Sequence, residues 1–116
     1  MTASDDYIKY VDMGLGDVPV MVGAGTDLER FATEVTGYGL HGAEKLFGIG
    51  GTVGDAVRIN AGGIGNIISG VVCLDPSDGS KRKFTAAECG FGEGTSVFSE
   101  SVRYTVSSIL VRLSRD

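Results

Sequence analysis

The stretch from Gly37 to Gly65 constrains this chain most, because ten of its residues are glycine. Glycine costs backbone entropy in helices and strands, so such clustering is useful where the backbone needs positive φ or must approach another group closely. Apolar residues alternate with the glycines, which is not typical of a flexible linker. We predict an ordered loop, a short helix and a second loop, whose backbone amides could receive a phosphate or a flat ring. The interleaved apolar residues are Leu40, Leu46, Phe47, Ile49, Val53, Ala56, Val57 and Ile59.

The length and charge of the chain limit its class. Its 116 residues suffice for one small domain over residues 1–116. A net charge of −5 argues against nucleic acid as a partner, because binding it needs a basic surface. No apolar run is long enough to span a membrane and no secretory signal is apparent, so we expect a cytoplasmic protein without a membrane partner. Cys73 and Cys89 lack CxxC spacing, which favours buried free thiols over a disulfide or a metal site.

The pattern of strands and turns predicts an α+β fold built mainly on antiparallel sheet. Strands and tight turns follow one another, without the strand–helix alternation of a doubly wound sheet. Pro19 indicates an edge strand or a strand-entry position. The predicted strands are Tyr7–Met13 and Val18–Val22, which form a hairpin, then Ile67–Leu74, Lys81–Thr85 and Val102–Leu113, with an irregular segment at Ala86–Phe98.

One helix is well marked between the second strand and the glycine-rich stretch. Thr26 and Glu29 have the spacing of a capping box, in which each side chain accepts a backbone amide of the first turn. Gly37 is expected to end the helix in a left-handed conformation. The spacing of Leu28, Phe31, Ala32 and Val35 predicts an apolar face, and we expect the core to add Leu46, Val71, Leu74, Ile109 and Val111.

Two common phosphate-binding motifs fail in this sequence. The pattern G-x-G-x-x-G begins at Gly48 but meets valine at position 53, and no G-K-[ST] follows a glycine loop. A glycine loop, Gly48–Gly54, nevertheless leads into a short helix, and amides at a helix start favour anions such as a diphosphate. From the residues alone, a ligand loop and a structural loop at a tight corner are about equally supported.

Several runs of the chain resemble one enzyme family. LFGIGGTVGDAVRINAGGIG is similar to the flavin-binding signature of the UDP-N-acetylenolpyruvoylglucosamine reductase (MurB) family, where a GIPGTVGGA…NAGAYG run lines the isoalloxazine and diphosphate of FAD. VPVMVGAGTDLERFATEVTGYGLHGAEKL and AAECGFGEGTSVF resemble further family segments in the same order, so the likeness covers about residues 18–113. The resemblance implies a PCMH-type FAD-binding lobe with FAD as cofactor, bound by Gly48, Ile49, Gly50, Gly51, Thr52, Val53, Gly54, Asp55, Ala56, Asn60, Gly62 and Gly65.

The chain also departs from the family at positions that matter for chemistry. The first lobe with its diphosphate loop, and the substrate domain with its proton-donating serine, have no counterpart in residues 1–116. Gly50 stands for the family's proline and Ile64 for its tyrosine, while Glu93-Gly94-Thr95 replaces Tyr-Arg-Asp and removes the active-site arginine. Ser96 matches the serine of that motif, which is not the proton donor. We therefore assign no catalytic residue, and expect a module related to the NADPH-dependent UDP-N-acetylmuramate dehydrogenase of peptidoglycan precursor synthesis that does not catalyse alone.

Other interpretations remain open. The chain could be a remnant that has lost flavin and acts as a binding or self-association domain, as a homo-oligomer or with a partner that supplies the first lobe. It could also be a fragment of a longer enzyme. The Asp55 carboxylate would repel a diphosphate unless Arg58 offsets it, whereas His41 and the run Lys81–Lys83 are typical of solvated surface. No metal site is expected.

Overall fold

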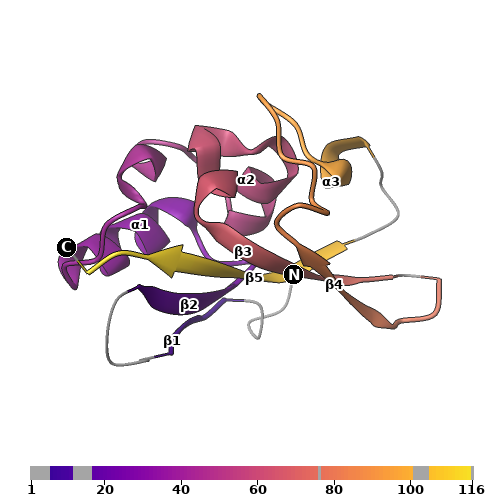
Figure 1. Ribbon diagram of the computed structural model, residues 1–116, viewed down its shortest axis with the longest axis horizontal. Coiled ribbons are helices and arrows are strands. Elements are labelled where there is room, and N and C mark those ends of the chain that lie inside the picture. Colours follow the sequence, from indigo (N-terminus) through magenta and orange to yellow (C-terminus); the bar gives the residue numbers. More distant parts are fainter. Residues whose placement is uncertain (1–5, 12–16, 76, 101–104, 116) are drawn as a thin grey trace.

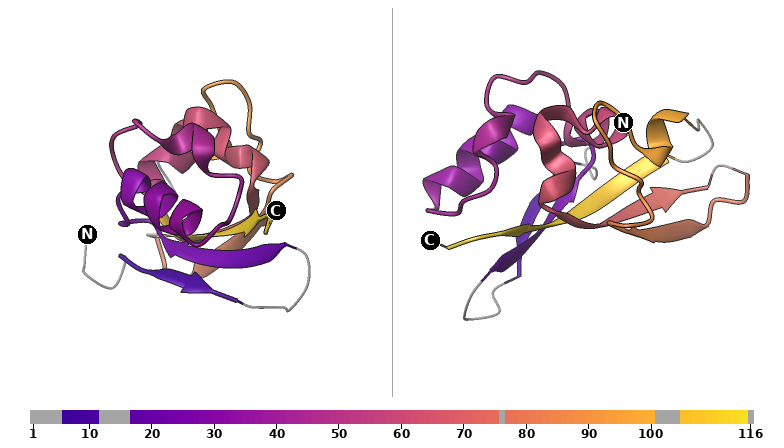
Figure 2. Two further views of the ribbon diagram at one scale, coloured as in Figure 1. Left: turned by 90° about the vertical axis from the view of Figure 1, so that its left-hand side faces the viewer. Right: turned by 45° about the horizontal axis from the view of Figure 1, so that its top comes forward.

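The computed structural model describes residues 6–11, 17–75, 77–100 and 105–115. These form a five-stranded sheet in the order β1-β2-β5-β3-β4, in which every paired strand is antiparallel, and the helices lie over one of its faces (Figures 1 and 2). The predicted α+β class is therefore confirmed. The elements are β1 Ile8–Tyr10, β2 Val18–Gly23, α1 Leu28–Gly37, η2 Glu44–Leu46, α2 Val53–Ile59, η3 Ala61–Asn66, β3 Ile68–Leu74, β4 Lys81–Thr85, α3 Val97–Glu100 and β5 Thr105–Leu113.

The last strand, β5, is the centre of the sheet. It pairs with β2 on one side and with β3 on the other, which brings the predicted hairpin β1–β2 and a second hairpin, β3–β4, into one sheet. Pro19 is the second residue of β2 and lies opposite Arg112, so its strand is internal and the strand-entry interpretation holds. β1 is shorter than predicted and β5 begins at Thr105; Asp12, Met13 and residues 102–104 of the predicted strands lie outside the described residues.

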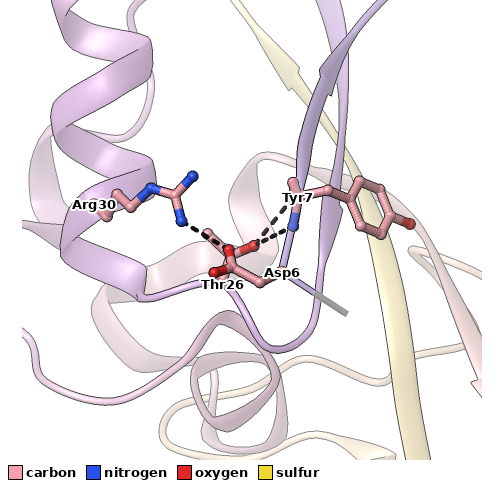
Figure 3. Close-up of polar contacts among 4 residues, drawn as sticks. All are labelled: Asp6, Tyr7, Thr26 and Arg30. Carbon is pink, nitrogen blue, oxygen red and sulfur yellow. Dashed lines mark hydrogen bonds and ion pairs between the residues drawn. The ribbon is translucent and has the colours of Figure 1, made fainter. Parts of the chain in front are cut away.

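The predicted capping box at Thr26 is wrong. The N-cap of α1 is Asp27, and no side chain caps this helix. The Thr26 hydroxyl instead accepts the backbone N–H of Tyr7 at 3.0 Å and donates to the Tyr7 carbonyl at 3.2 Å (Figure 3). Beside it, Arg30 donates to Asp6 at 2.8 Å. A tertiary contact thus takes the hydroxyl that local sequence assigned to the helix end, and it ties the entry of β1 to the start of α1.

The helix also ends later than predicted. Gly37 is the last residue of α1, and the positive φ falls on Gly39 at 81°. The amide of Gly39 donates to the carbonyl of Thr36 at 3.0 Å, and the amide of Leu40 donates to that of Val35 at 3.1 Å. This pair of bonds is a Schellman motif, which satisfies carbonyls that the last turn leaves free. Two glycines in one short window were each suitable for this role, and the second one takes it.

The core lies between the sheet and the helices. Every residue of the predicted apolar face of α1 is fully buried, and so are nearly all the other predicted core residues. The exception is Leu74, which is only half-buried because it lies near the end of β3 on the sheet face away from the helices. The buried face of the sheet is formed chiefly by Val20, Val22, Val71, Ile109 and Val111.

Two free thiols lie in this core, as predicted: Cys73 and Cys89 are both buried. Burial raises the pKa of Cys73 to about 12 and that of Cys89 to about 11, from an ordinary value of 9.0. Because an apolar interior disfavours the thiolate, the folded chain keeps both protons at pH values where the unfolded chain releases them.

Alkaline pH should therefore weaken the fold through these two thiols. Their contribution to the free energy of unfolding is complete below about pH 9. It decreases as pH rises toward the folded-state pKa values, by about 1.4 kcal/mol per thiol and pH unit. Denaturant unfolding at a series of pH values from about 8 to about 11 measures the effect. The double variant Cys73→Ala/Cys89→Ala is the control and should show a shallower decrease. Equal slopes for the two proteins would contradict the assignment.

Candidate functional site

The start of α2 lies within the stretch that the sequence singled out. Thr52 is its N-cap; the Thr52 hydroxyl accepts the amide of Asp55, and the Asp55 carboxylate accepts the amide of Thr52, each at 3.2 Å. This is a complete capping box, and sequence reasoning missed it although the pattern T-x-x-D was visible. Asp55, which the resemblance placed among the FAD-binding residues, therefore has a structural function at the start of this helix.

The next amides of α2 also have acceptors within the protein. Val53 donates to the carbonyl of Thr26 at 2.8 Å, and Gly54 donates to that of Ala24 at 2.9 Å. In return, the amide of Leu28 donates to the carbonyl of Gly51 at 3.0 Å. The first turn of α2 is thus held against the segment that joins β2 to α1, and its amides are not presented to an anion.

Gly50 and Gly51 differ from their neighbours in the loop. Among the residues that the structure describes, none accepts a hydrogen bond from their amides. A Cβ atom at Gly50 would meet nothing within 4 Å, and the same is true at Gly48, whose φ is 81°. Both residues are exposed. The loop therefore offers bare backbone with two free donors, which is the surface that a flat ring or a phosphate oxygen needs for close approach.

Asn60 connects the second loop to the rest of the chain. It has a left-handed backbone with φ 51°, the one non-glycine residue with positive φ in the described part of the chain. Its side-chain oxygen accepts the amide of Gly65 at 2.7 Å, and its side-chain nitrogen donates to the carbonyl of Gly92 at 2.8 Å. Asn60 thereby closes η3 and holds the turn around Gly92 against it.

Gly62 and Gly65 are required by packing. A Cβ atom at Gly62, where φ is 60°, would lie 2.7 Å from Cδ1 of Ile49, and one at Gly65 would lie 2.5 Å from Cγ of Phe91. Such distances are shorter than any tolerated carbon–carbon contact. Close packing within the chain therefore explains why these two positions are glycine, whereas it does not explain Gly50.

A hollow of about 330 Å³ lies beside the start of α2. Three of the predicted binding residues, Thr52, Gly54 and Asp55, line it, and Arg58 adds a positive charge. Among the described residues no ion pair joins Asp55 to Arg58, although both face this hollow. Gly62 lines a different hollow, of about 260 Å³, beside η2. The structure thus brings together only part of the predicted set; the other lining residues of the first hollow are Ala24, Thr105 and Val106.

The segment that replaces the family's arginine is a tight turn. Gly94 has φ 70°, and the amide of Gly92 donates to the carbonyl of Thr95 at 3.0 Å across the turn. Glycine adopts this conformation without the cost that a long side chain would incur. The hydroxyl of the next residue, Ser96, is buried; it donates to the carbonyl of Arg58 at 2.7 Å and accepts the amide of Phe98 at 3.1 Å. Ser96 therefore joins the segment to α2 in a structural role.

The remaining polar candidates lie on the surface. His41 is exposed, and its Nδ1 lies 3.1 Å from a carboxylate oxygen of Glu44. Lys81, Arg82 and Lys83 are exposed on the edge strand β4, as predicted. Within the described ranges, no group of three or more His, Cys, Asp or Glu side chains could hold a metal ion, and no helix is long and apolar enough to cross a membrane.

The capping box at the start of α2 gives a first test of the site geometry. Thr52→Ala should lower the free energy of unfolding by about 1 kcal/mol, because Asp55 loses its acceptor. Asp55→Asn should have a smaller effect, since the side-chain oxygen still reaches the Thr52 amide. Chemical denaturation measures both values, and Thr33→Ala on the exposed face of α1 is the control. If Thr52→Ala matched this control, the capping role would be refuted.

Comparison with known proteins agrees with this geometry. No family model matches the chain. The UDP-N-acetylenolpyruvoylglucosamine reductase of Thermobifida fusca is 35% identical over 112 residues, which are 93% of this chain and 32% of that protein. The reductase of Anoxybacillus flavithermus is 38% identical over 92 residues, 77% of this chain and 30% of that protein. The chain thus spans about a third of the length of these curated relatives.

A solved structure extends the likeness to the fold. The crystal structure of UDP-N-acetylenolpyruvylglucosamine reductase (MurB) from Thermus caldophilus superposes with a TM-score of 0.71 and 32% sequence identity, over 83% of this chain and 36% of that one. The agreement covers the antiparallel sheet and its helices and not merely a short motif. Sequence and fold together show that this chain belongs to the MurB family, matching about a third of the length of the reductases.

Proposed function

We propose that the chain is a flavin-binding module of the MurB type, whose ligand is FAD. The observation that carries the proposal is the bare backbone of Gly50 and Gly51, whose two amides have no acceptor in the described chain. The space beside Gly50 is open, and both residues lie inside the run that resembles the family's flavin signature. When bound, FAD would supply the ring that carries hydride between a nicotinamide and a substrate.

The residues of this chain would bind and orient the flavin rather than react. The amides of Gly50 and Gly51 would donate hydrogen bonds, and the missing side chains at Gly48 and Gly50 would let a planar ring approach the backbone. Arg58, facing the hollow beside α2, would offset the negative charge of Asp55 toward a diphosphate. Thr52 and Asp55 would act indirectly, by fixing the start of α2.

Catalysis by this chain alone is not part of the proposal. Stabilising a developing enolate needs a positioned cation and a general acid. At the position that matches the arginine the chain has Gly94 in a tight turn, and residues 1–116 contain no counterpart of the proton-donating serine. Ser96 does not match that donor, and its hydroxyl is committed to Arg58 and Phe98. UDP-N-acetylmuramate dehydrogenase activity would therefore require a first lobe and a substrate domain in addition to residues 1–116.

One observation favours a second candidate, a domain that has kept the fold and lost the flavin. The first-turn amides of α2 are satisfied by Thr26, Ala24 and the capping box, so little of the loop remains for a diphosphate. This domain would act through binding or self-association.

Titration with FAD separates the two candidates. Flavin fluorescence and calorimetry should show saturable binding, with a yellow protein after gel filtration. Absence of binding at high micromolar FAD would refute the flavin module and leave the interaction domain.

A further inference from the structure

The five strands carry a charge opposite to that of the whole chain. They contain five Lys and Arg residues and no Asp or Glu, although the chain has 15 acidic and 10 basic residues. The acidic residues of the described chain therefore all lie in helices and loops. This separation of charge has no use in the proposed flavin site, because none of the residues that would bind flavin lies on a strand.

The register shows that four of these cations share the sheet face away from the helices. Lys9 lies opposite Met21, which lies opposite Leu110, and directly paired residues point to the same side of a sheet. Lys83 pairs with Val72, and Val72 pairs with Ser108. Ser108 lies two residues before Leu110 on the same strand, so Lys83 points to the same side of the sheet as Lys9. The open face thus carries Lys9, Lys81, Lys83 and Arg112, all exposed.

The middle of the open face is apolar and hollow. A depression of about 160 Å³ is lined there by Met21, Gly70, Val72, Lys83, Ser108 and Leu110. A volume of about 150 Å³ accepts a benzene-sized group in a protein interior, so this hollow is large enough for one apolar side chain. None of the described helices crosses this face (Figure 2).

The opposite side of the molecule has the complementary character. Over the helix-covered side, exposed acids outnumber the exposed cations Arg30, Lys45 and Arg82; the acids include Glu29 of α1, Glu44 of η2, Asp55 of α2 and Glu93. The same side exposes apolar groups, among them Ile59 at the end of α2, whose residue is 53% exposed and lies one turn after Asp55. An apolar side chain beside a carboxylate is the group that an apolar hollow ringed by cations would accept.

We propose that the open sheet face binds the acidic, helix-covered side of a second copy of this chain. Sheet-to-sheet contact would place the four cations of one copy against those of the other, which is unfavourable. The contact is therefore between two different surfaces, and such head-to-tail contacts extend into open chains of molecules unless rotation closes a ring. The association depends on concentration and is screened by salt.

Sedimentation of the chain without FAD tests this inference independently of the flavin proposal. From micromolar to millimolar concentration at low salt, the weight-average mass should rise above 12.0 kDa and return to it at high salt. Lys83→Glu/Arg112→Glu should weaken association by about tenfold or more. Lys45→Glu reverses one charge on the helix side and should leave the association intact or strengthen it.

Two further measurements distinguish this association from the effects of misfolding and from contacts through other surfaces. Gly70→Val fills the hollow without charge change; its Cβ would meet only the Phe84 carbonyl, at 3.4 Å, so the fold should persist while association weakens. Carbodiimide coupling of isotopically mixed copies should join Lys9 or Lys83 of one copy to an acid of the helix side of another.

A monomer throughout, an equal loss in Lys45→Glu, or cross-links confined to other surfaces would overturn the inference. Binding of the monomer to vesicles of anionic phospholipid, with no association of copies, would overturn it in favour of a lipid surface.

Discussion

Gly65→Ala should lower the free energy of unfolding by about 3 kcal/mol, because the added methyl group has no space. Its carbon would lie 2.5 Å from Cγ and 2.9 Å from Cβ of Phe91. Phe91 cannot rotate away, since the second contact is with the base of its side chain. The backbone angle is not the cause, as Gly65 does not have a positive φ. Denaturant unfolding, followed by far-UV circular dichroism, measures the loss.

A double-mutant cycle identifies the contact. In a Phe91→Ala background, which removes the ring but keeps Cβ, Gly65→Ala should cost much less, with a coupling of about 1–2 kcal/mol. Gly50→Ala is the matched control, because a methyl group there meets nothing within 4 Å. A wild-type stability for Gly65→Ala would show that η3 and the segment after β4 are not packed as described.

Asn60→Ala should have the next largest effect, about 2–3 kcal/mol, because two contributions are lost together. The side chain holds the Gly65 amide and the Gly92 carbonyl at 2.7 and 2.8 Å. In addition, alanine at φ 51° is strained, since asparagine tolerates the left-handed region better than alanine does. The free energy of unfolding is again the measurement.

Two conservative variants separate these contributions. Asn60→Gly relieves the strain and still loses both hydrogen bonds, whereas Asn60→Asp keeps the acceptor for Gly65 and loses the donor to Gly92. Each should fall between wild type and Asn60→Ala. If Asn60→Gly were as stable as wild type, the two side-chain bonds would contribute nothing and the account of this loop would fail.

The fold could be predicted from sequence to the extent that local periodicity reports it. The apolar face of α1 follows from spacing alone, and every member of it is buried. The ends of that helix did not follow, because a capping pattern at Thr26 is not used and two glycines, Gly37 and Gly39, are available at its end. The cap at Thr26 is not used because Tyr7, 19 residues away in the sequence, donates its amide to that hydroxyl.

The candidate site was marked by its glycines, but their separate roles were hidden. Gly62 and Gly65 are fixed by contacts with Ile49 and Phe91, which no local pattern announces. Gly50 belongs to the same glycine-rich stretch, but a Cβ atom there would meet nothing within 4 Å. The function of Asp55 was missed for a related reason: the resemblance drew attention to the ligand, whereas the local pattern pointed to the helix cap.

The most direct measurement of the central claim compares FAD affinity in two variants, Gly50→Val and Gly37→Val. A Cβ atom at either position meets nothing within 4 Å, and neither residue has a positive φ, so both proteins should fold. If flavin lies on the backbone of Gly50 and Gly51, Gly50→Val should raise the dissociation constant by about tenfold or more, whereas Gly37→Val should bind as wild type does. Equal affinities in the two variants, or no saturable binding by the wild type, would contradict the claim.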